Sequence, residues 1–320
     1  MSTAAGTPYV LTFGETMALI KADTPGPLAH ATSMSPGMGG SESNVAIGLQ
    51  RLGTSAQWCG RVGNDALGEL VLREIRAEGV QVHATLDHGA PTGLMIKERR
   101  TAALQNVIYY RKGSAGSRLS STDVPEQLIT GAALVHISGI TPALSDQAAA
   151  TVHYAIAAAR AAGVPISLDL NYRRALWNAE DAAAAYQKLI PLVDIVFAGD
   201  DEATIAVGEA PGPAALAQRI AALGPSQVII KLGSEGAVAI INGGHYSQRP
   251  IAIDALDTVG AGDAFVAGYL AELVAGKTPE ERLLTAAQTG AFACLVSGDW
   301  EGAPRRSELG LLGGKEPVSR

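Results

Sequence analysis

The stretch DTVGAGDAF, residues 257–265, places two glycines, an aspartate and the start of an apolar run side by side. The apolar run has helical spacing, which predicts a helix over 262–275. The first N–H groups of a helix have no partner within it, and the helix dipole is positive there. Because glycine lets a phosphate approach the backbone, Gly260, Ala261 and Gly262 are candidates for an anion hole.

Asp263 follows these small residues directly. An aspartate in the first turn of a helix has a simple structural explanation, since it complements the dipole. The anion hole beside it suggests a second role. Phosphoryl transfer to an alcohol needs amides that stabilise the transferring group and a carboxylate that takes the hydroxyl proton. Asp263 is therefore our candidate general base, and residues 260–262 are the candidate phosphoryl site.

The rest of the chain alternates apolar runs with stretches of helical periodicity. The runs predict strands at 9–13, 17–21, 56–63, 133–138, 166–170, 194–198, 227–233, 237–241, 244–248 and 251–255. The periodic stretches predict helices over 45–53, 66–79, 145–163, 179–190, 200–208, 213–223 and 279–296. Such alternation is typical of an α/β fold with a parallel sheet covered on both faces, whose ligands bind at the carboxyl ends of the strands.

The segment 92–111 is different, because it predicts two strands around a polar turn with no helix after them. Together with 17–21 it could form a small accessory sheet. We therefore expect one domain, residues 1–320, with lid segments near 15–38 and 91–117. Since a small lid sheet has open edges that a second subunit could cover, we expect a homodimer or homotetramer.

Composition excludes several classes of function. The chain has 320 residues, 47% of them hydrophobic, and a net charge of −7 with no basic stripe, so we expect no nucleic-acid partner. The N-terminus lacks the features of a signal peptide, and no apolar span is long enough for a membrane, which predicts a cytoplasmic location. Cys59 and Cys294 are far apart and are expected to be small buried hydrophobic residues.

A loose match to the Walker A pattern lies in AELVAGKT, residues 271–278. The preceding residues continue a helix, and Ala271 stands where a phosphate loop has its first glycine. Gly276 is placed to end that helix, while Thr278 and Glu281 form a capping box for the next. The stretch therefore predicts a junction between two helices rather than a phosphate loop.

With two further motifs, the chain resembles the ribokinase-like sugar kinases. DTVGAGDAFVAGYL (257–270) resembles their C-terminal signature, and GGSESNVAIGLQRLG (39–53) with GRVGNDALGE (60–69) resembles their N-terminal one. The resemblance covers nearly the whole chain. It implies a Rossmann-like three-layer α/β/α sandwich with a small β-sheet lid, and a reaction that uses ATP and Mg²⁺, with a monovalent cation left open. It also implies that Asp263 is the catalytic base.

The resemblance carries further residues to the nucleotide. KLGSEG, residues 231–236, is similar to the family's nucleotide loop, which implies contacts from Lys231, Gly233, Ser234 and Gly236. The cofactor set it implies also includes Asn171, Arg173, Gly260, Gly262 and Ala287. In GDDE (199–202), Glu202 matches the acidic residue that helps to place the metal. Gly199 stands where the family has Asn, so the water network around the metal is left open.

Two arginine-bearing segments concern the acceptor. YYRKGSAGS (109–117) and DLNYRRALW (169–177) bring Arg111 and Arg173 towards one cleft in our interpretation, while Arg174 has a simpler explanation as a surface cation. Arginine binds a carboxylate in a bidentate fork, which a neutral sugar does not require. We therefore expect an acidic sugar as substrate.

Within the family, these segments together with GDWEGAP (298–304) most resemble the 2-keto-3-deoxygluconate kinases. That resemblance implies phosphorylation of the C6 hydroxyl of this sugar acid. The substrate residues that the resemblance implies are Gly40, Tyr109, Tyr110, Arg111, Arg173, Asp263 and Asp299. Met95 stands where these kinases have Tyr, which leaves open which C4 epimer of the sugar acid the enzyme prefers. The alternatives are a kinase of fructokinase or ribokinase type, and a non-catalytic sugar- or nucleotide-binding regulator.

Overall fold

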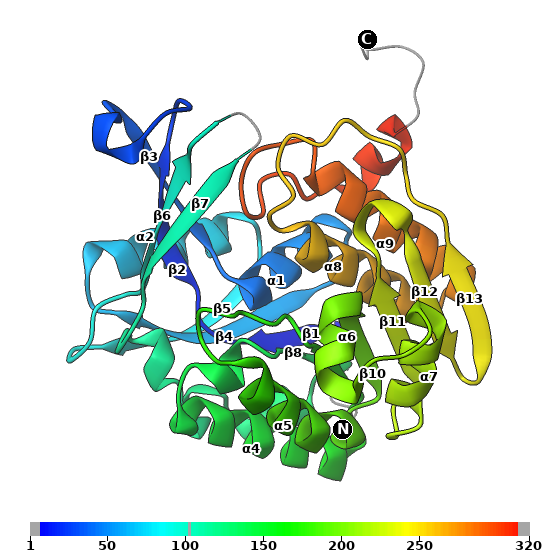
Figure 1. The fold of residues 1–320 in the computed structure, drawn as a ribbon. Coiled ribbons are helices and arrows are strands. Elements are labelled where there is room, and N and C mark those ends of the chain that lie inside the picture. Colours follow the sequence, from blue (N-terminus) through cyan, green and yellow to red (C-terminus); the bar gives the residue numbers. More distant parts are fainter. Residues whose placement is uncertain (1–6, 102–103, 313–320) are drawn as a thin grey trace.

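A nine-stranded mixed sheet forms the centre of the protein in a computed structural model that describes residues 7–101 and 104–312 (Figure 1). Its order is β13-β12-β11-β10-β9-β8-β1-β4-β5. The parallel strands are β1 (Val10–Phe13), β4 (Ala56–Gly63), β5 (Gln81–Asp87), β8 (Leu134–Ser138), β9 (Ile166–Asp169), β10 (Ile195–Gly199) and β11 (Gln227–Lys231). The last two, β12 (Ala237–Ile241) and β13 (Gly244–Gln248), pair antiparallel and extend the parallel part of the sheet at this edge.

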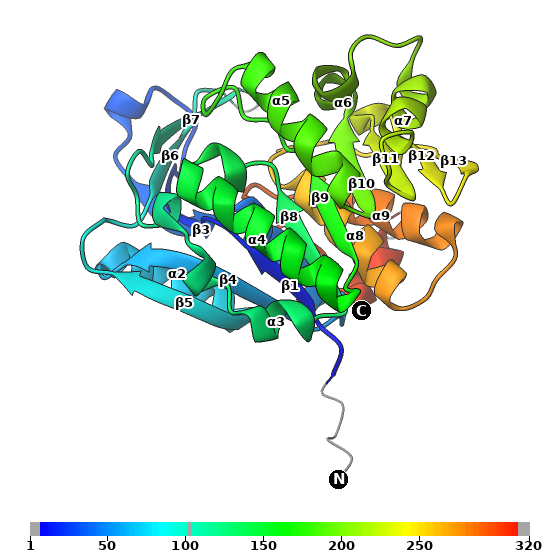
Figure 2. The ribbon, with the colours of Figure 1, turned by 90° about the horizontal axis from the view of Figure 1, so that it is seen from below.

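Helices cover both faces of this sheet, each over its own hydrophobic core. One face carries α1 (Ser41–Arg51), α2 (Ala66–Ala77), α8 (Ala261–Val274) and α9 (Pro279–Ala293). The other carries α3 (Glu126–Thr130), α4 (Asp146–Ala162), α5 (Ala179–Leu189), α6 (Asp200–Val207) and α7 (Pro213–Ala221), which lie in front of the sheet in Figure 2. The predicted three-layer α/β/α arrangement is confirmed. None of the described helices combines the length and hydropathy needed to cross a bilayer.

A separate four-stranded sheet lies beside the carboxyl ends of the central strands (Figure 1). Its order is β3 (Met34–Gly39), β2 (Met17–Ala22), β6 (Leu94–Arg99) and β7 (Gln105–Tyr110). This is the predicted lid, and Met17, Leu19 and Met95 pack together on its inner face. Strand β3 was not predicted, because its sequence MSPGMG is poor in strand formers. A proline is tolerated there because β3 is an edge strand.

Two other local differences have physical reasons. Strand β5 escaped prediction because it is an edge strand and most of its residues are only half-buried, so it lacks a continuous apolar run. The predicted strand at 251–255 is wrong, since this segment pairs with no strand and lines a cavity instead. The predicted helix junction is confirmed: Gly276 has a φ of 71°, and Thr278 and Glu281 form the capping box that begins α9.

Candidate active site

The N-terminus of α8 forms one wall of the cleft between lid and central sheet. Gly260 is the N-cap residue of the helix and has a left-handed φ of 76°, so the helix begins without a side-chain cap. A Cβ atom at Gly260 would overlap the carbonyl oxygen of Asp299, so only glycine fits there. Gly260 and Gly262 line the central cavity, of about 380 Å³. The predicted anion hole therefore faces open space that a phosphoryl group can enter.

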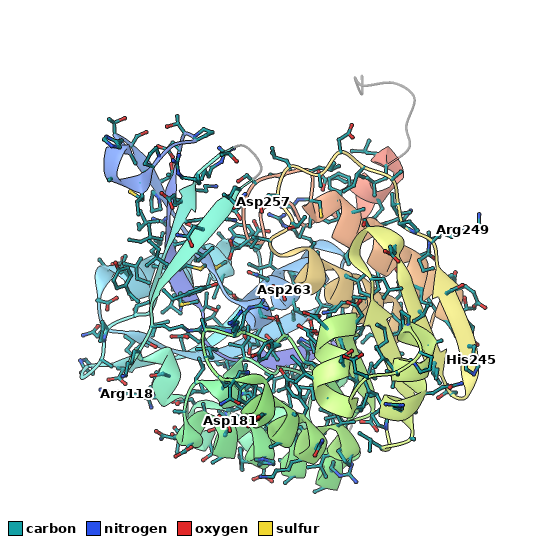
Figure 3. The ribbon with its side chains drawn as sticks, in the orientation of Figure 1. Arg118, Asp181, His245, Arg249, Asp257 and Asp263 are labelled. Atoms are coloured by element: carbon teal, nitrogen blue, oxygen red, sulfur yellow. The ribbon has the colours of Figure 1, made fainter. Side chains whose placement is uncertain are left out.

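Asp263 lies in the first turn of α8, at the centre of the molecule in Figure 3. The residue is 8% exposed and lines both the central cavity and a smaller one beneath the lid. Ser41 Oγ donates a hydrogen bond to one oxygen and Asn44 Nδ2 donates to the other, each at 2.8 Å. Burial raises the pKa of Asp263, and these two hydrogen bonds partly offset the rise. The result is a held, desolvated carboxylate that faces the cleft, the arrangement a general base requires.

Ser41 and Asn44 come from the start of α1, more than 200 residues before Asp263. Asn171 Nδ2 donates to Ser41 Oγ at 2.7 Å, so the loop after β9 is tied to the same group. The φ of Asn171 is 45°, a left-handed conformation that asparagine tolerates better than most residues. Asn171 was predicted to lie near the phosphates, and the structure places it on the wall of the central cavity.

Six of the predicted nucleotide residues line a further cavity of about 490 Å³, whereas Asn171, Arg173 and Gly260 line the central cavity. Its polar wall carries Lys231, Gly233, Ser234, Gly236 and Gly262. The remaining lining is mostly apolar and includes Pro250, Ile251, Ala252, Ile253, Ala255, Phe265, Ala287, Ala291 and Cys294, with Thr258 as a polar member. An apolar slot with a polar end suits a purine ring followed by phosphates. Because Gly262 and Lys231 also line the central cavity, the two spaces adjoin.

Lys231 ends β11 and reaches across to Asp169 at the end of β9. Its Nζ donates to both carboxylate oxygens at 2.7 Å. Burial works against the charged form of the lysine, but Asp169 and Glu202 outweigh it and raise the pKa of Lys231. Asp169 was not predicted as a site residue, although it lies at the carboxyl end of a parallel strand, where ligands of such sheets bind.

Glu202, the predicted metal residue, lies on the wall of the central cavity. Its two carboxylate oxygens accept the backbone N–H groups of Tyr172 at 2.9 Å and Gly199 at 2.7 Å. It therefore joins the loop after β9 to the start of α6. Among the described residues, no three His, Cys, Asp or Glu side chains form a cluster able to hold a metal ion alone. A metal here would need oxygen ligands from a bound phosphate as well.

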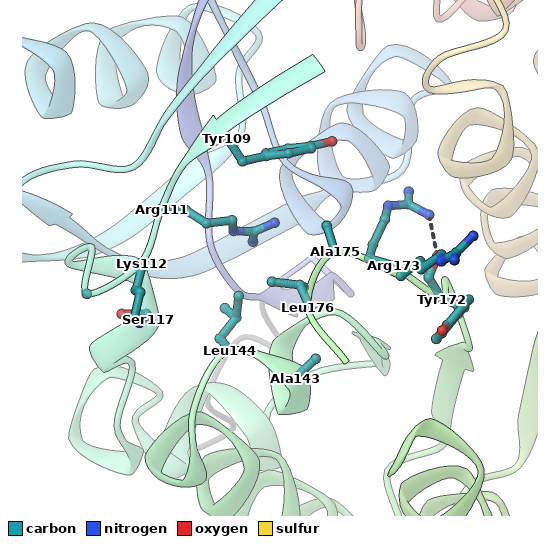
Figure 4. Close-up of a pocket in the computed structure, with 12 residues that line it drawn as sticks. Tyr109, Arg111, Lys112, Ser117, Ala143, Leu144, Tyr172, Arg173, Ala175 and Leu176 are labelled. Atoms are coloured by element: carbon teal, nitrogen blue, oxygen red, sulfur yellow. Dashed lines mark hydrogen bonds between the residues drawn. The ribbon is translucent and has the colours of Figure 1, made fainter. Parts of the chain in front are cut away.

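The acceptor side of the cleft brings together Tyr109, Arg111, Arg173 and Asp299, with Gly40 at its base. In Figure 4, Arg111 from the lid and Arg173 from the loop after β9 lie on opposite sides of the pocket, with the guanidinium of Arg173 turned towards the carbonyl of Tyr172. Beyond them lies an outer cavity of about 720 Å³ that also takes in Lys112 and Arg174. Arg174 therefore lines the mouth of the cleft rather than the small inner cavity.

Tyr110 does not belong to this group. Successive residues of a strand point to opposite faces of the sheet, and Tyr109 faces the cleft. Tyr110 is 60% exposed and lines none of the cavities described above, so our expectation that both tyrosines face the cleft is wrong. Strand alternation should have excluded one of the two from sequence alone.

The two arginines differ in how far they are neutralised. Arg111 donates from Nε to Glu15 Oε2 at 2.8 Å, and its Nη2 lies 2.5 Å from the same oxygen. The Glu15 side chain is fully buried and also accepts a hydrogen bond from Ser114. Arg173 is exposed and donates to the carbonyl oxygen of Tyr172 at 3.1 Å. Arg173 is thus the better placed of the two to meet an added anion.

Glu42 is a buried carboxyl at the base of the cleft that sequence reasoning missed. It is 1% exposed and accepts a hydrogen bond of 2.5 Å from Thr141 Oγ1. Its second oxygen has no partner among the described residues. Burial raises the pKa of Glu42 to about 8, with Asp263 adding to the rise and Thr141 and Arg111 opposing it.

Comparison with known proteins agrees with this geometry. The model of the pfkB family of carbohydrate kinases matches residues 7–306. The chain is 35% identical over 303 residues to a 2-dehydro-3-deoxygluconokinase of Bacillus subtilis, covering 93% of each chain. It is also 35% identical over 320 residues to a 2-dehydro-3-deoxygalactonokinase of Haloferax volcanii, covering 98% of this chain and 100% of that one.

Solved structures show the same fold. A PfkB protein from Polaromonas sp. JS666 superposes with a TM-score of 0.87 at 35% identity, over 95% of this chain and 99% of that one. An Escherichia coli protein of the ribokinase II type, solved with ATP and Mg²⁺, superposes with a TM-score of 0.88 at 24% identity, over 95% and 98%. The chain belongs to the pfkB family of carbohydrate kinases. It is therefore a kinase of carbohydrate metabolism.

The pKa of Glu42 leads to a prediction about stability. Between the ordinary value of 4.5 and about 8, the folded protein must keep a proton that the unfolded chain releases, so stability falls as pH rises. Glu42→Gln removes this penalty. We expect the free energy of unfolding of the variant, relative to that of the wild type, to rise from pH 5 to pH 8 by up to about 1.4 kcal/mol per pH unit. Urea denaturation at several pH values measures it, with exposed Glu180→Gln as control. A difference independent of pH would contradict the prediction.

Proposed function

We propose that this kinase transfers the γ-phosphoryl group of ATP to the C6 hydroxyl of 2-keto-3-deoxygluconate, also named 2-dehydro-3-deoxygluconate. The observation that carries the proposal is the position of Asp263. Its carboxylate opens onto the acceptor side of the cleft, while the adjoining Gly262 lines the apolar nucleotide cavity. A hydroxyl beside Asp263 would therefore meet a phosphoryl group at the N-terminus of α8.

The chemistry follows from the neighbours of this carboxylate. Asp263 takes the proton of the attacking hydroxyl as the oxygen bonds to phosphorus, and the proton stays on the carboxyl group until the product leaves. The amides at residues 260–262 lie where negative charge builds up on the transferring group. Lys231 lies 3.7 Å from the position of a Cβ on Gly262, so its ammonium is close enough to face the nucleotide phosphates.

Mg²⁺ fits the carboxylates of the central cavity when phosphates are present. This ion usually binds through one or two carboxylates, several waters and the substrate phosphates. Asp201 and Glu202 both line that cavity. We propose that they hold the ion through water, because the oxygens of Glu202 already accept backbone N–H groups. When bound, the ion would neutralise charge on the phosphates.

A sugar acid is favoured as acceptor because the outer half of the cleft is cationic. Arg111, Lys112, Arg173 and Arg174 line the outer cavity, and no carboxylate shares that lining. In a protein of net charge −7, such a local group of cations is needed to attract an anion. We propose that Arg173 binds the sugar carboxylate, while Arg111 is held by Glu15 and fixes the end of lid strand β7.

The C4 epimer, 2-keto-3-deoxygalactonate, is a second candidate substrate. Met95 lies opposite Tyr109 in the lid and lines the inner cavity, where the resemblance led us to expect a tyrosine. A methionine offers no hydroxyl with which to distinguish one C4 configuration from the other. The chain is equally identical, at 35%, to relatives named for each epimer. We therefore propose activity on both.

A panel of acceptors tests the substrate. We expect ADP release with both C4 epimers, with kcat/KM values within about tenfold of each other, because Met95 offers neither C4 configuration a hydrogen bond that would discriminate against the other. Ribose and fructose should be poorer by more than about tenfold. Equal activity on these neutral sugars would refute the sugar-acid assignment, and ligand binding without ADP release would favour a regulator.

Asp263→Asn tests the base. We expect kcat to fall about 10²–10⁴-fold, because the amide cannot accept the proton, while affinity for ATP stays the same. Asp146→Asn is the matched control, since Asp146 is also an aspartate in the first turn of a helix but is exposed. Near-normal turnover of the Asp263 variant, measured by steady-state kinetics, would remove this residue from the mechanism.

The two arginines should behave differently when replaced. Arg173→Gln should raise KM for the sugar acid roughly 10- to 100-fold without lowering the melting temperature, because an exposed charge-assisted hydrogen bond is lost. Arg111→Gln should also destabilise the protein by about 3–5 kcal/mol, since it leaves buried Glu15 without its cation. Kinetics and thermal unfolding separate the two effects. An unchanged KM in the Arg173 variant argues against its role as carboxylate partner.

A further inference from the structure

Lys97 is a buried cation that the reaction above does not use. It lies on lid strand β6, its side chain is 1% exposed, and it reaches the edge of the central cavity. An ammonium group loses several kcal/mol of hydration when it is buried, so it needs carboxylates or other acceptors beside it. Its neighbours therefore indicate what the lysine holds in place.

Two carboxylates from the central body of the protein meet this one ammonium. Nζ of Lys97 donates to Asp257 Oδ2 at 2.9 Å and lies 3.5 Å from Asp299 Oδ1. The side chain of Asp257 is 2% exposed and that of Asp299 is 11% exposed. The lid is thus joined to the body by a buried ion pair as well as by the chain connections.

Asp257 also accepts backbone hydrogen bonds from two loops. One of its oxygens accepts the N–H of Val259 at 3.1 Å, and the other accepts the N–H of Gly298 at 3.2 Å. Val259 directly precedes Gly260, whose left-handed backbone packs against the carbonyl group of Asp299. The loops 257–260 and 297–299 therefore meet at the lysine on one side and at the anion hole on the other.

We propose that Lys97 is a positioning residue whose ammonium clamps the lid to the two loops that shape the anion hole. When the clamp is made, the α8 amides and Asp299 are held in place while the lid covers the cleft. The inference rests on the proposed roles of Asp263 and the α8 amides. It also means that the chain supplies its own monovalent cation at these carboxylates, so added K⁺ is not needed for turnover.

Lys97→Met tests the clamp, because methionine keeps the apolar stem and removes the charge. In a choline salt we expect kcat to fall about 100-fold, since a misplacement of about 1 Å can have that effect. NH₄⁺ or K⁺ at the same ionic strength should bind between the two carboxylates and raise the kcat of the variant at least about tenfold. The same ions should raise the variant's melting temperature, because they bind the folded state.

Three controls separate the clamp from a general effect on folding. Lys21→Met removes the lysine that lies beside Lys97 in strand register but is partly exposed and 3.8 Å from Glu301, so its activity should match the wild type in every salt. The double variant Lys97→Met/Asp257→Asn should lose the response to NH₄⁺ and K⁺, because one carboxylate of the site is gone. The wild type should respond to neither ion.

The proposal is overturned if Lys97→Met turns over at the wild-type rate in choline, or if it is equally impaired in all salts. Activation of the wild type by K⁺ would also overturn it. A variant too unstable in choline can be purified in an ammonium salt and then diluted into each test salt. Kinetics use whichever sugar the wild type phosphorylates best, and the melting temperatures need no sugar, so an error in the substrate leaves this test intact.

Discussion

The burial of one carboxylate at the start of α8 is the constraint on which the site depends. Asp263 is held by Ser41 and Asn44 from α1, so the two ends of the chain must fold together before the group is placed. Helices α1 and α8 pack on the same face of the sheet, which brings these residues within hydrogen-bond distance. The carboxylate is desolvated by its own fold and yet open to the cleft, and a proton acceptor needs both conditions.

Three cations of the cleft are each paired with a buried acid. Lys231 is paired with Asp169, Arg111 with Glu15, and Lys97 with Asp257. Each pair joins two elements that are distant in the sequence, so the pairs position the walls of the cleft as well as setting its charge. Arg173, which is exposed and held through a backbone carbonyl, is a cation that remains available to an incoming anion. Cations of the same chemical type therefore have two roles in the cleft: some hold its walls together, and Arg173 is available to bind a ligand.

Sequence reasoning predicted the elements of the fold well where the pattern was strong. The parallel strands from β8 to β11 are buried apolar runs between helices, so periodicity and composition agreed. It failed at β3 and β5, which are edge strands with weak patterns, and at 251–255, where an apolar run lines a cavity instead of pairing. The helix junction at Thr278 was predictable because a capping box acts between neighbouring residues.

For the site, the sequence by itself determined the local features: a glycine-flanked helix start, an aspartate in its first turn, and a glycine-bearing loop after β11. These depend on backbone conformations and short-range hydrogen bonds, which neighbouring residues control. Only the tertiary structure decided that Ser41 and Asn44 hold Asp263, that Glu15 neutralises Arg111, and that Tyr110 faces away from the cleft. Such pairings depend on which helices pack on the same face of the central sheet and on which side of a lid strand faces the cleft. Both are set by the packing of segments that are distant in the sequence.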